Sequence, residues 1–255
     1  AEDGSDWADM PFVGRSRTVI YAPSASVFTG LREREMTERY DVDILAAGDP
    51  DYSFIGEGER TLRPLPNTRA EVEGIGGMFE EDRSVILVGA KASEAAVKRN
   101  IEVNPSRLIH LAAHGLVDPV TPAGSSIALA SSPDDGEDGF LHTLEILSLN
   151  VESRLVVLSA CETARGRVSR GEGVVGLSRA FLGAGASAVV SSLWAVPDES
   201  TSELMKTFYK YMVKKKKPAH EALREARKVL LESGEFSHPF HWASFILIGT
   251  EKAPN

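Results

Sequence analysis

Cysteine is almost absent from the chain, which has only Cys161. A disulfide framework is therefore excluded, and so is a zinc site made of several cysteines. Long apolar runs are absent too, since no stretch approaches the ~18 consecutive apolar residues of a membrane-spanning helix. The acidic start, AEDGSDWADM, lacks the basic and apolar regions of a signal peptide. These absences predict a soluble protein of the cytoplasm, a reducing compartment, with no membrane association.

Positive charge is also scarce. The 255 residues hold 28 Lys and Arg against 37 Asp and Glu, which gives a net charge of -9 at pH 7. Such a chain lacks the electrostatic surface that binds nucleic acid or anionic membranes, so neither is expected as a direct partner. Hydrophobic residues at 42% and charged residues at 25% are ordinary for a globular protein and exclude wholesale disorder. The chain begins without methionine, as a processed piece of a longer protein would.

Short apolar runs alternate along the chain with helical patterns. The runs that predict strands are 18–22, 43–47, 84–89, 107–113, 154–160, 188–194 and 244–248. Several are apolar almost throughout, as in RLVVLSA and SFILIG, which is typical of strands buried on both faces of a mainly parallel sheet. The helical patterns are 67–79, 93–101, 173–185, 199–215 and 218–234. This alternation predicts a doubly wound α/β domain whose central sheet has about six to seven strands, with helices on both faces.

Local signals refine this picture in two places. Thr68 and Glu71 have the spacing of a capping box at the start of the helix 67–79. Two long polar segments, 116–139 and 162–173, each follow a predicted strand and are expected to be loops of low local stability. Open α/β sheets carry their sites at the carboxyl ends of strands, so these loops are expected to flank such a site.

A histidine and the single cysteine follow two of the predicted strands. RLIHLAA ends just before His114 and Gly115, and RLVVLSA ends just before Cys161. If the two strands are neighbours, an imidazole that takes a proton and a thiolate that attacks a carbonyl would face one crevice. The backbone N–H groups of Gly115 and Cys161 could then donate to a developing oxyanion. The residues alone leave open a second interpretation, in which Cys161 is a buried structural side chain.

Other patterns indicate chemistry more weakly. GEGVVG at 171–176 spells G-x-G-x-x-G, with Asp198 further on, but a polar loop separates it from the preceding strand, which argues against a dinucleotide site. His238 and His241 have no evident third ligand, so no metal site is predicted. His110 lies in the middle of a predicted strand and is expected to be a core histidine.

Four segments together resemble the CHAT domain, a caspase-like peptidase domain that is often attached to TPR repeats and is related to separase. They are HLAAHG at 110–115, LSACETARG at 158–166, the stretch from GEGVVG to MKTFY at 171–209, and HPFHWASFILIG at 238–249. The resemblance implies a caspase-like α/β fold. It predicts a domain over residues 17–249, between a tail or junction at 1–16 and a tail at 250–255.

By this resemblance, His114 is the general base and Cys161 the nucleophile of a cysteine endopeptidase that needs neither cofactor nor metal. Its partners are expected to be a protein substrate and an attached or associated sensor, such as TPR repeats or a ligand-binding domain. Two other functions stay open: a non-catalytic CHAT-like scaffold that only binds proteins, and a nucleotide-binding α/β protein. The presence of both His114 and Cys161 favours the peptidase over the scaffold.

Asp198 is the candidate for substrate specificity. It follows SSLWAVP, and in the families that the chain resembles this segment supplies an acid to the specificity pocket. A desolvated carboxylate pairs best with Arg and next best with Lys, which predicts cleavage after these residues. An alternative role for Asp198 is the N-cap of the helix 199–215. Glu162 and Trp194 are further candidates for contact with the substrate, although packing against the sheet is the simpler role for Trp194.

Overall fold

The predicted strands form one sheet in the computed structural model, which describes residues 7–34, 39–53, 62–118, 121–131, 136–159 and 172–250. Within these residues the sheet has seven strands in the order β1-β10-β9-β8-β4-β2-β3. They are β1 (Ile20–Tyr21), β2 (Val42–Pro50), β3 (Ser84–Gly89), β4 (Ser106–Ala112), β8 (Leu155–Leu158), β9 (Ala188–Ser192) and β10 (Phe245–Gly249). Neighbouring strands are parallel except β9 and β10. The prediction of a mainly parallel sheet of six to seven strands is therefore confirmed.

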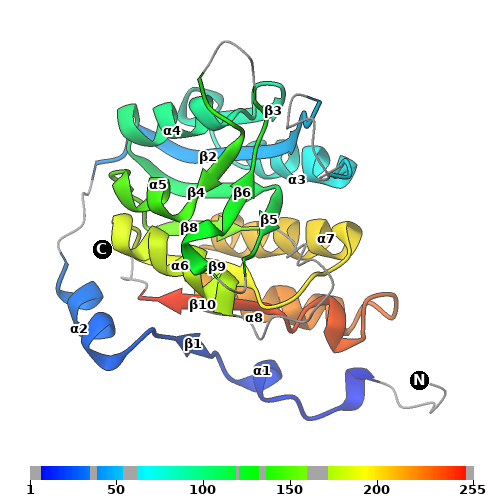
Figure 1. Cartoon of the computed structure of the whole chain (residues 1–255). Helices are drawn as coiled ribbons and strands as arrows, with labels where there is room; N and C mark the ends of the chain where they lie inside the picture. The colour runs from blue at the N-terminus through cyan, green and yellow to red at the C-terminus, as the bar shows by residue number, and fades with distance from the viewer. Residues whose placement is uncertain are drawn as a thin grey trace.

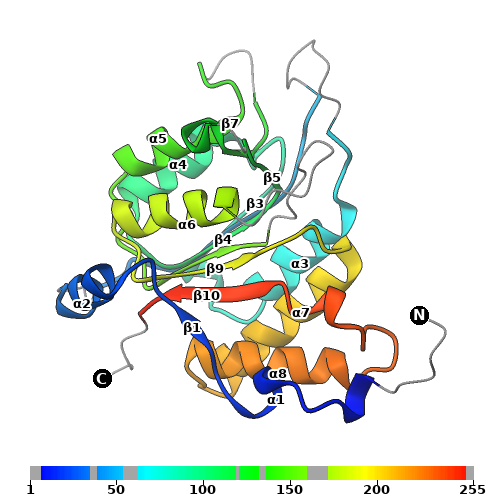
Figure 2. The ribbon, with the colours of Figure 1, turned by 60° about the horizontal axis from the view of Figure 1, so that its bottom comes forward.

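Helices cover both faces of this sheet (Figure 1). One layer consists of α4 (Glu94–Val103), α5 (Thr143–Ser148) and α6 (Glu172–Ala184). The other consists of α3 (Pro66–Gly76), α7 (Asp198–Tyr209) and α8 (Ala219–Leu231). Figure 2 shows the first layer above the sheet and the second below it. The domain is thus a three-layer α/β sandwich, as the alternation of strands and helices predicts.

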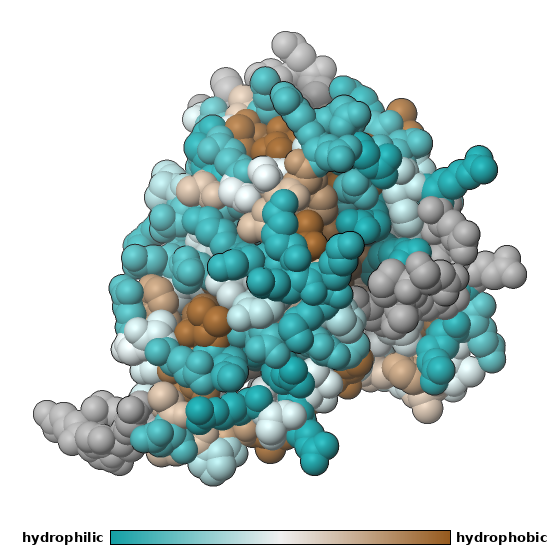
Figure 3. All heavy atoms as spheres, turned by 180° about the vertical axis from the view of Figure 1, so that it is seen from behind, coloured by the Kyte–Doolittle hydropathy of each residue, from teal (hydrophilic) through white to brown (hydrophobic). Residues whose placement is uncertain are grey.

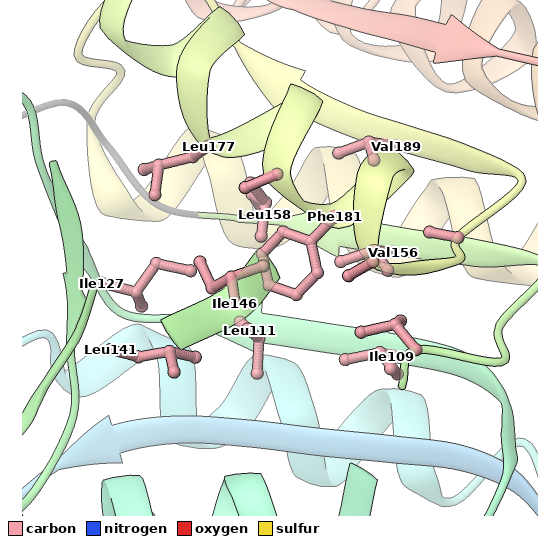
Figure 4. Packing of buried hydrophobic residues seen from close by; sticks show 14 of the residues in the cluster. Ile109, Leu111, Ile127, Leu141, Ile146, Val156, Leu158, Leu177, Phe181 and Val189 are labelled. Carbon is pink, nitrogen blue, oxygen red and sulfur yellow. The ribbon is translucent and has the colours of Figure 1, made fainter. Parts of the chain in front are cut away.

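Each helical layer buries its own hydrophobic cluster against the sheet. On the side of α4, α5 and α6, Phe181 lies among Ile109, Val156 and their neighbours (Figure 4). On the side of α3, α7 and α8, Phe208 packs with Leu108 in a second cluster. Successive residues of β4 alternate between the clusters because side chains along a strand point to opposite faces. This double burial explains why the strands are apolar without a break.

Short polar signals fix where several helices begin. Ser24 Oγ accepts from the backbone N–H of Val27 at the start of α2 (Ala25–Glu33), and Ser93 Oγ accepts from Ala96 at the start of α4. These bonds satisfy N–H groups that have no partner inside the helix. The remaining short elements are η1 (Trp7–Asp9), α1 (Val13–Ser16), η2 (Glu81–Arg83), η3 (Pro122–Gly124), η4 (Lys210–Lys214) and η5 (Pro239–His241).

The predicted capping box of α3 is wrong. The helix begins at Pro66, with Leu65 at the N-cap position. Thr68 Oγ1 accepts from the backbone N–H of Asp49 over 2.8 Å, and Glu71 is fully buried. Both side chains are therefore used in contacts with the sheet, which local spacing does not reveal.

The segment 116–139 is also more ordered than the loop that its polar composition predicts. It holds β6 (Ser126–Ala128), which pairs antiparallel with β5 (His114–Leu116) and with β7 (Phe140–His142) in a small second sheet. Ile127 and Leu129 are fully buried. The prediction of a loop is wrong here because an apolar run this short is hidden among Pro, Gly and Ser. Most of the segment 162–173 lies outside the described residues.

The N-terminal segment runs along one edge of the domain (Figure 1). The ring of Trp7 lies 4.7 Å from the His238 ring, and the ring of Phe12 lies 5.2 Å from that of Trp242, between centroids. Residues before 17 thus contact the domain, whose limits at 17 and 249 stay a prediction. Among the described helices, none is long and apolar enough to cross a membrane. Figure 3 shows a mainly hydrophilic rear face with apolar residues in small, separate patches.

Gly48 lies in β2 where α3 comes close to the sheet. A Cβ atom there would lie 2.8 Å from both the Thr68 carbonyl oxygen and Val72 Cγ1. We expect Gly48→Ala to lower the free energy of unfolding by about 1–3 kcal/mol in urea denaturation, because the methyl group forces helix and strand apart. Gly74→Ala in α3 is the matched control, since its Cβ would meet only Lys206 Cε at 3.7 Å. It should stabilise by up to about 1 kcal/mol, and equal unfolding midpoints for the two variants would contradict this view of α3.

Candidate active site

His114 follows β4 at the carboxyl edge of the main sheet and begins β5. The residue is buried, with 5% exposed. Nε2 of the ring lies 2.7 Å from the carbonyl oxygen of Arg63. A carbonyl oxygen only accepts hydrogen bonds, so the neutral ring carries its proton on Nε2. Nδ1 is then the acceptor, and no described residue supplies a partner for it.

Tyr52 packs next to the His114 ring, and both side chains are largely buried. The centroids of the His114 and Tyr52 rings are 5.5 Å apart, and the backbone N–H of His114 donates to the Tyr52 hydroxyl over 3.4 Å. Burial lowers the pKa of His114, and the Arg63 carbonyl and the charge of Asp198 oppose this only in part. Burial also raises the pKa of Tyr52, so its hydroxyl stays protonated. A neutral imidazole that accepts through Nδ1 can take a proton from a thiol.

Asp198 is the first residue of α7, and Pro197 occupies the N-cap position. The alternative prediction, that Asp198 caps its own helix, is therefore wrong. Its Oδ2 instead accepts from the backbone N–H of Asn67 over 3.1 Å, in the first turn of α3. Burial raises the pKa of Asp198 and the charge of Glu71 adds to this, whereas hydrogen bonds from Asn67 and the charge of His114 lower it. This half-buried carboxylate thus lies within electrostatic reach of His114.

The structure describes two of the other predicted site residues. Trp194 is half-buried, and its indole N–H donates to the Phe240 carbonyl over 3.0 Å. Gly115 is buried in β5, which pairs with β6. Contact of Trp194 with substrate and the oxyanion role of the Gly115 N–H stay predictions. Cys161 and Glu162 lie outside the described residues, so their predicted roles stay predictions too.

Three residues of this site were not found from the sequence. Tyr52 comes shortly after β2 ends at Pro50, and its place after a strand is a signal that could have found it. Arg63 and Asn67 contribute a backbone carbonyl and a backbone N–H. A backbone carbonyl is present in every residue, so the sequence holds no signal for Arg63. The Asn67 side chain also hydrogen-bonds to Asp198, but its own segment does not indicate this distant partner.

The weaker sequence patterns have local explanations. β8 ends at Leu158 and α6 begins at Glu172, so the strand does not lead directly into the helix as a dinucleotide site requires. His110 is fully buried in β4, which confirms the prediction of a core histidine. His238 and His241 both use Nδ1 in hydrogen bonds within the protein.

One group of described side chains has the spacing of a cation site. Oxygens of Glu94, Glu137 and Glu145 lie within 4.8 Å of one another. The Lys98 ammonium lies among them, at 3.2, 2.8 and 2.9 Å from the three carboxylates. Lys98 therefore already supplies the positive charge that a metal ion would bring.

The chain has clear relatives among known sequences. A family model described as CHAT domain matches residues 3–250. Tetratricopeptide repeat protein 28 of Mus musculus is 35% identical over 168 residues, which are 64% of this chain and 7% of the mouse protein. Its Homo sapiens counterpart is 38% identical over 130 residues, which are 46% of this chain and 5% of the human protein. The chain thus spans less than a tenth of the length of these relatives.

Solved structures share the fold. Separase, in the Saccharomyces cerevisiae separase–securin complex, superposes with a TM-score of 0.60 and 15% identity over 96% of this chain and 15% of that chain. Gingipain R, described as an Arg specific cysteine proteinase, gives a TM-score of 0.57 and 10% identity over 89% of this chain and 51% of its own. At these identities the likeness is one of fold, and it confirms the predicted caspase-like architecture.

Proposed function

The chain belongs to the CHAT domain family, and from this membership we propose that it is a cysteine endopeptidase that cleaves protein substrates. His114 is the general base and Cys161 the nucleophile. The observation that carries the proposal is the state of the His114 ring, whose Nε2 is held by the Arg63 carbonyl while Nδ1 remains the acceptor. A buried, neutral imidazole of this kind is what activation of a thiol needs.

The register of two strands supports the pairing of base and nucleophile. β4 and β8 are adjacent and parallel, with Leu111 opposite Leu158. His114 and Cys161 each come three residues after these partners in the sequence. Carboxyl ends of adjacent parallel strands meet at one edge of the sheet, where α/β proteins carry their sites.

The proposed reaction has two stages. The Cys161 thiol gives its proton to His114 Nδ1, and the thiolate attacks the carbonyl carbon of the scissile peptide bond. The C–N bond then breaks, the amine leaves with the proton from His114, and a thioester remains on Cys161. Water, deprotonated by His114, hydrolyses this thioester, and the returned proton restores the thiol.

We propose further that the substrate residue before the cut is Arg or Lys. Asp198 is the carboxylate that would pair with it, since it is half-buried and interacts electrostatically with His114. A carboxylate in a partly desolvated site favours the two parallel hydrogen bonds of a guanidinium. Gingipain R, which shares the fold, is described as an Arg specific cysteine proteinase, in agreement with this specificity.

Control by an attached or associated sensor is part of the proposal. The curated relatives are tetratricopeptide repeat proteins, of which this chain spans only a small part. Separase, which shares the fold, is found in a complex with another protein, securin. The proposed sensor is therefore a partner protein or a fused repeat region that binds this domain and controls its activity.

A peptide-library digest tests the proposed function. The wild-type chain and its Cys161→Ala variant are incubated with the library, and new termini are identified by mass spectrometry. Cleavage by the wild type alone, concentrated after Arg and Lys, is the expected result. If both proteins produce the same cleavages, or if neither does so with or without a candidate repeat-region partner, the peptidase function is wrong.

A further inference from the structure

Glu71 and His110 form a buried hydrogen-bonded pair on the α3 side of the sheet. Glu71 Oε1 lies 2.7 Å from His110 Nε2, and both side chains are fully buried. Glu71 belongs to α3 and His110 to β4, and the Tyr209 ring of α7 lies edge-on to His110, with 5.4 Å between centroids. The pair takes no direct part in the proposed reaction, so its presence needs another explanation.

Three polar atoms of this group have no hydrogen-bond partner within the described part of the chain. They are Glu71 Oε2, His110 Nδ1 and the Tyr209 hydroxyl. Unsatisfied buried polar atoms are costly, and a buried hydrogen-bonded pair is often no more stabilising than well-packed apolar side chains of the same shape. Stability alone would therefore favour apolar residues here. Polar groups fit a role in fixing one geometry, because a hydrogen bond has a direction that apolar packing lacks.

The pair holds the segment that carries the partners of both proposed site residues. The Arg63 carbonyl, which bonds His114, comes just before α3, and the Asn67 N–H, which bonds Asp198, lies in its first turn. Glu71 follows about one helical turn after Asn67. Its partner His110 comes four residues before His114 in the sequence.

The bond between Glu71 and His110 therefore fixes α3 against β4. It does so about one helical turn from the Asn67 N–H that bonds Asp198. A shift of α3 would move the Asn67 N–H, and it would pull on the adjoining segment that carries the Arg63 carbonyl. The charge of Glu71 also reaches Asp198, whose pKa it raises in addition to the effect of burial. The other groups that act on this carboxylate, Asn67 and His114, lower its pKa.

We propose that Glu71 is a positioning residue: through its bond to His110 it fixes α3, whose first turn presents the N–H partner of Asp198 and which directly follows the segment that presents the carbonyl partner of His114. This role depends on the peptidase function proposed above. A displacement of about 1 Å in an active site can cost about 10²-fold in rate, so a small movement of α3 has a measurable effect.

Three variants of the full 255-residue chain test this role. Glu71→Gln keeps the shape and an oxygen acceptor but removes the charge. The double variant Glu71→Leu/His110→Leu replaces both hydrogen-bonded partners with apolar side chains and is expected to fold, since such paired replacements can be nearly neutral or stabilising. Tyr209→Phe is the matched control, because it changes the same buried group without changing the pair.

In the first measurement, kcat and KM for an Arg-containing peptide are recorded against pH. The double variant should lose at least tenfold in kcat/KM while its melting temperature stays near that of the wild type. Glu71→Gln should move the acidic limb of the profile to lower pH, because loss of the negative charge lowers the pKa of Asp198. Tyr209→Phe should leave both the limb and the rate in place. A purely structural role would change the melting temperature and leave the limb where it is.

A second measurement needs no turnover. In the Cys161→Ala background, carboxyl ¹³C NMR follows the titration of Asp198, and ring NMR follows His114. Glu71→Gln should shift the Asp198 titration to lower pH, and the double variant should change the ring signals of His114. If both variants show the same Asp198 titration and the same His114 ring signals as the wild type, the proposal is wrong. If the wild type shows no cleavage that depends on Cys161, the peptidase function fails, and these spectra still decide whether Glu71 positions the two residues.

Discussion

His114→Ala is expected to lower kcat/KM on an Arg-containing peptide by about 10²–10⁴-fold, the usual loss when a general base is removed. Cys161→Ala should reduce turnover to background, since no bond to the substrate can form. The double variant His114→Ala/Cys161→Ala should have a kcat/KM no lower than that of Cys161→Ala alone, because base and nucleophile act as one unit and their losses do not add. Steady-state kinetics with a fluorogenic peptide measure all three. Iodoacetamide should inactivate the wild type by alkylating the thiol.

A matched histidine control separates this effect from general damage. His142 is the N-cap residue of α5 and the last residue of β7, which β6 separates from the β5 strand that His114 begins. Asparagine caps helices well, so His142→Asn should keep both activity and melting temperature. Turnover by Cys161→Ala above background would show that Cys161 is not the nucleophile. Full activity of the His114→Ala variant would likewise show that His114 is not the general base.

Asp198→Asn is expected to lose at least tenfold in kcat/KM on Arg peptides, because the amide cannot pair with a cation as a carboxylate does. Asparagine is the informative substitution here. Its amide oxygen can still accept from the Asn67 N–H, whereas alanine would also remove this contact with α3, a loss of about 1 kcal/mol for a cap of this kind. The melting temperature of Asp198→Asn should therefore stay close to that of the wild type. Kinetics on peptides that differ only in Arg, Lys or norleucine before the cut measure the loss.

Glu199→Gln is the control for this variant, since the exposed Glu199 follows Asp198 in the same helix. It should keep the Arg preference. Burial raises the pKa of Asp198, so the carboxylate is protonated, and cleavage after Arg is lost, at a higher pH than for an ordinary aspartate. An Asp198→Asn enzyme that still prefers Arg would show that other residues form the specificity pocket.

Features that depend on the pattern of a single segment were predicted correctly from the sequence. The runs around 107–113 and 154–160 predict buried parallel strands because apolar residues continue without a break. His114 follows the first run, and the structure describes it at the carboxyl edge of the sheet. His110 is the core histidine that its mid-strand position predicts. In these cases the burial of each residue follows directly from the pattern of its own segment.

The sequence failed where the role of a residue depends on a distant segment. Thr68 and Glu71 have capping-box spacing, yet both side chains bond across from helix α3 to the sheet. Thr68 bonds to Asp49 in β2, and Glu71 bonds to His110 in β4. Ile127 lies in a segment whose polar composition predicts a loop, yet its side chain is buried in β6. Local spacing measures neighbours along the chain, and these side chains bond to partners that only folding brings near.

The α/β class, the mainly parallel sheet and the position of His114 after a strand all follow from the order of residues along the chain, because apolar periodicity is a local property. What holds that histidine depends on contacts between distant segments. The Arg63 carbonyl sets which nitrogen carries the proton, and the Asn67 N–H holds Asp198. Both are backbone groups, which occur in almost every residue, and the side chain of Asn67 adds a second hydrogen bond to Asp198. Their roles come from where α3 packs against the sheet, and no pattern in one segment can specify that contact.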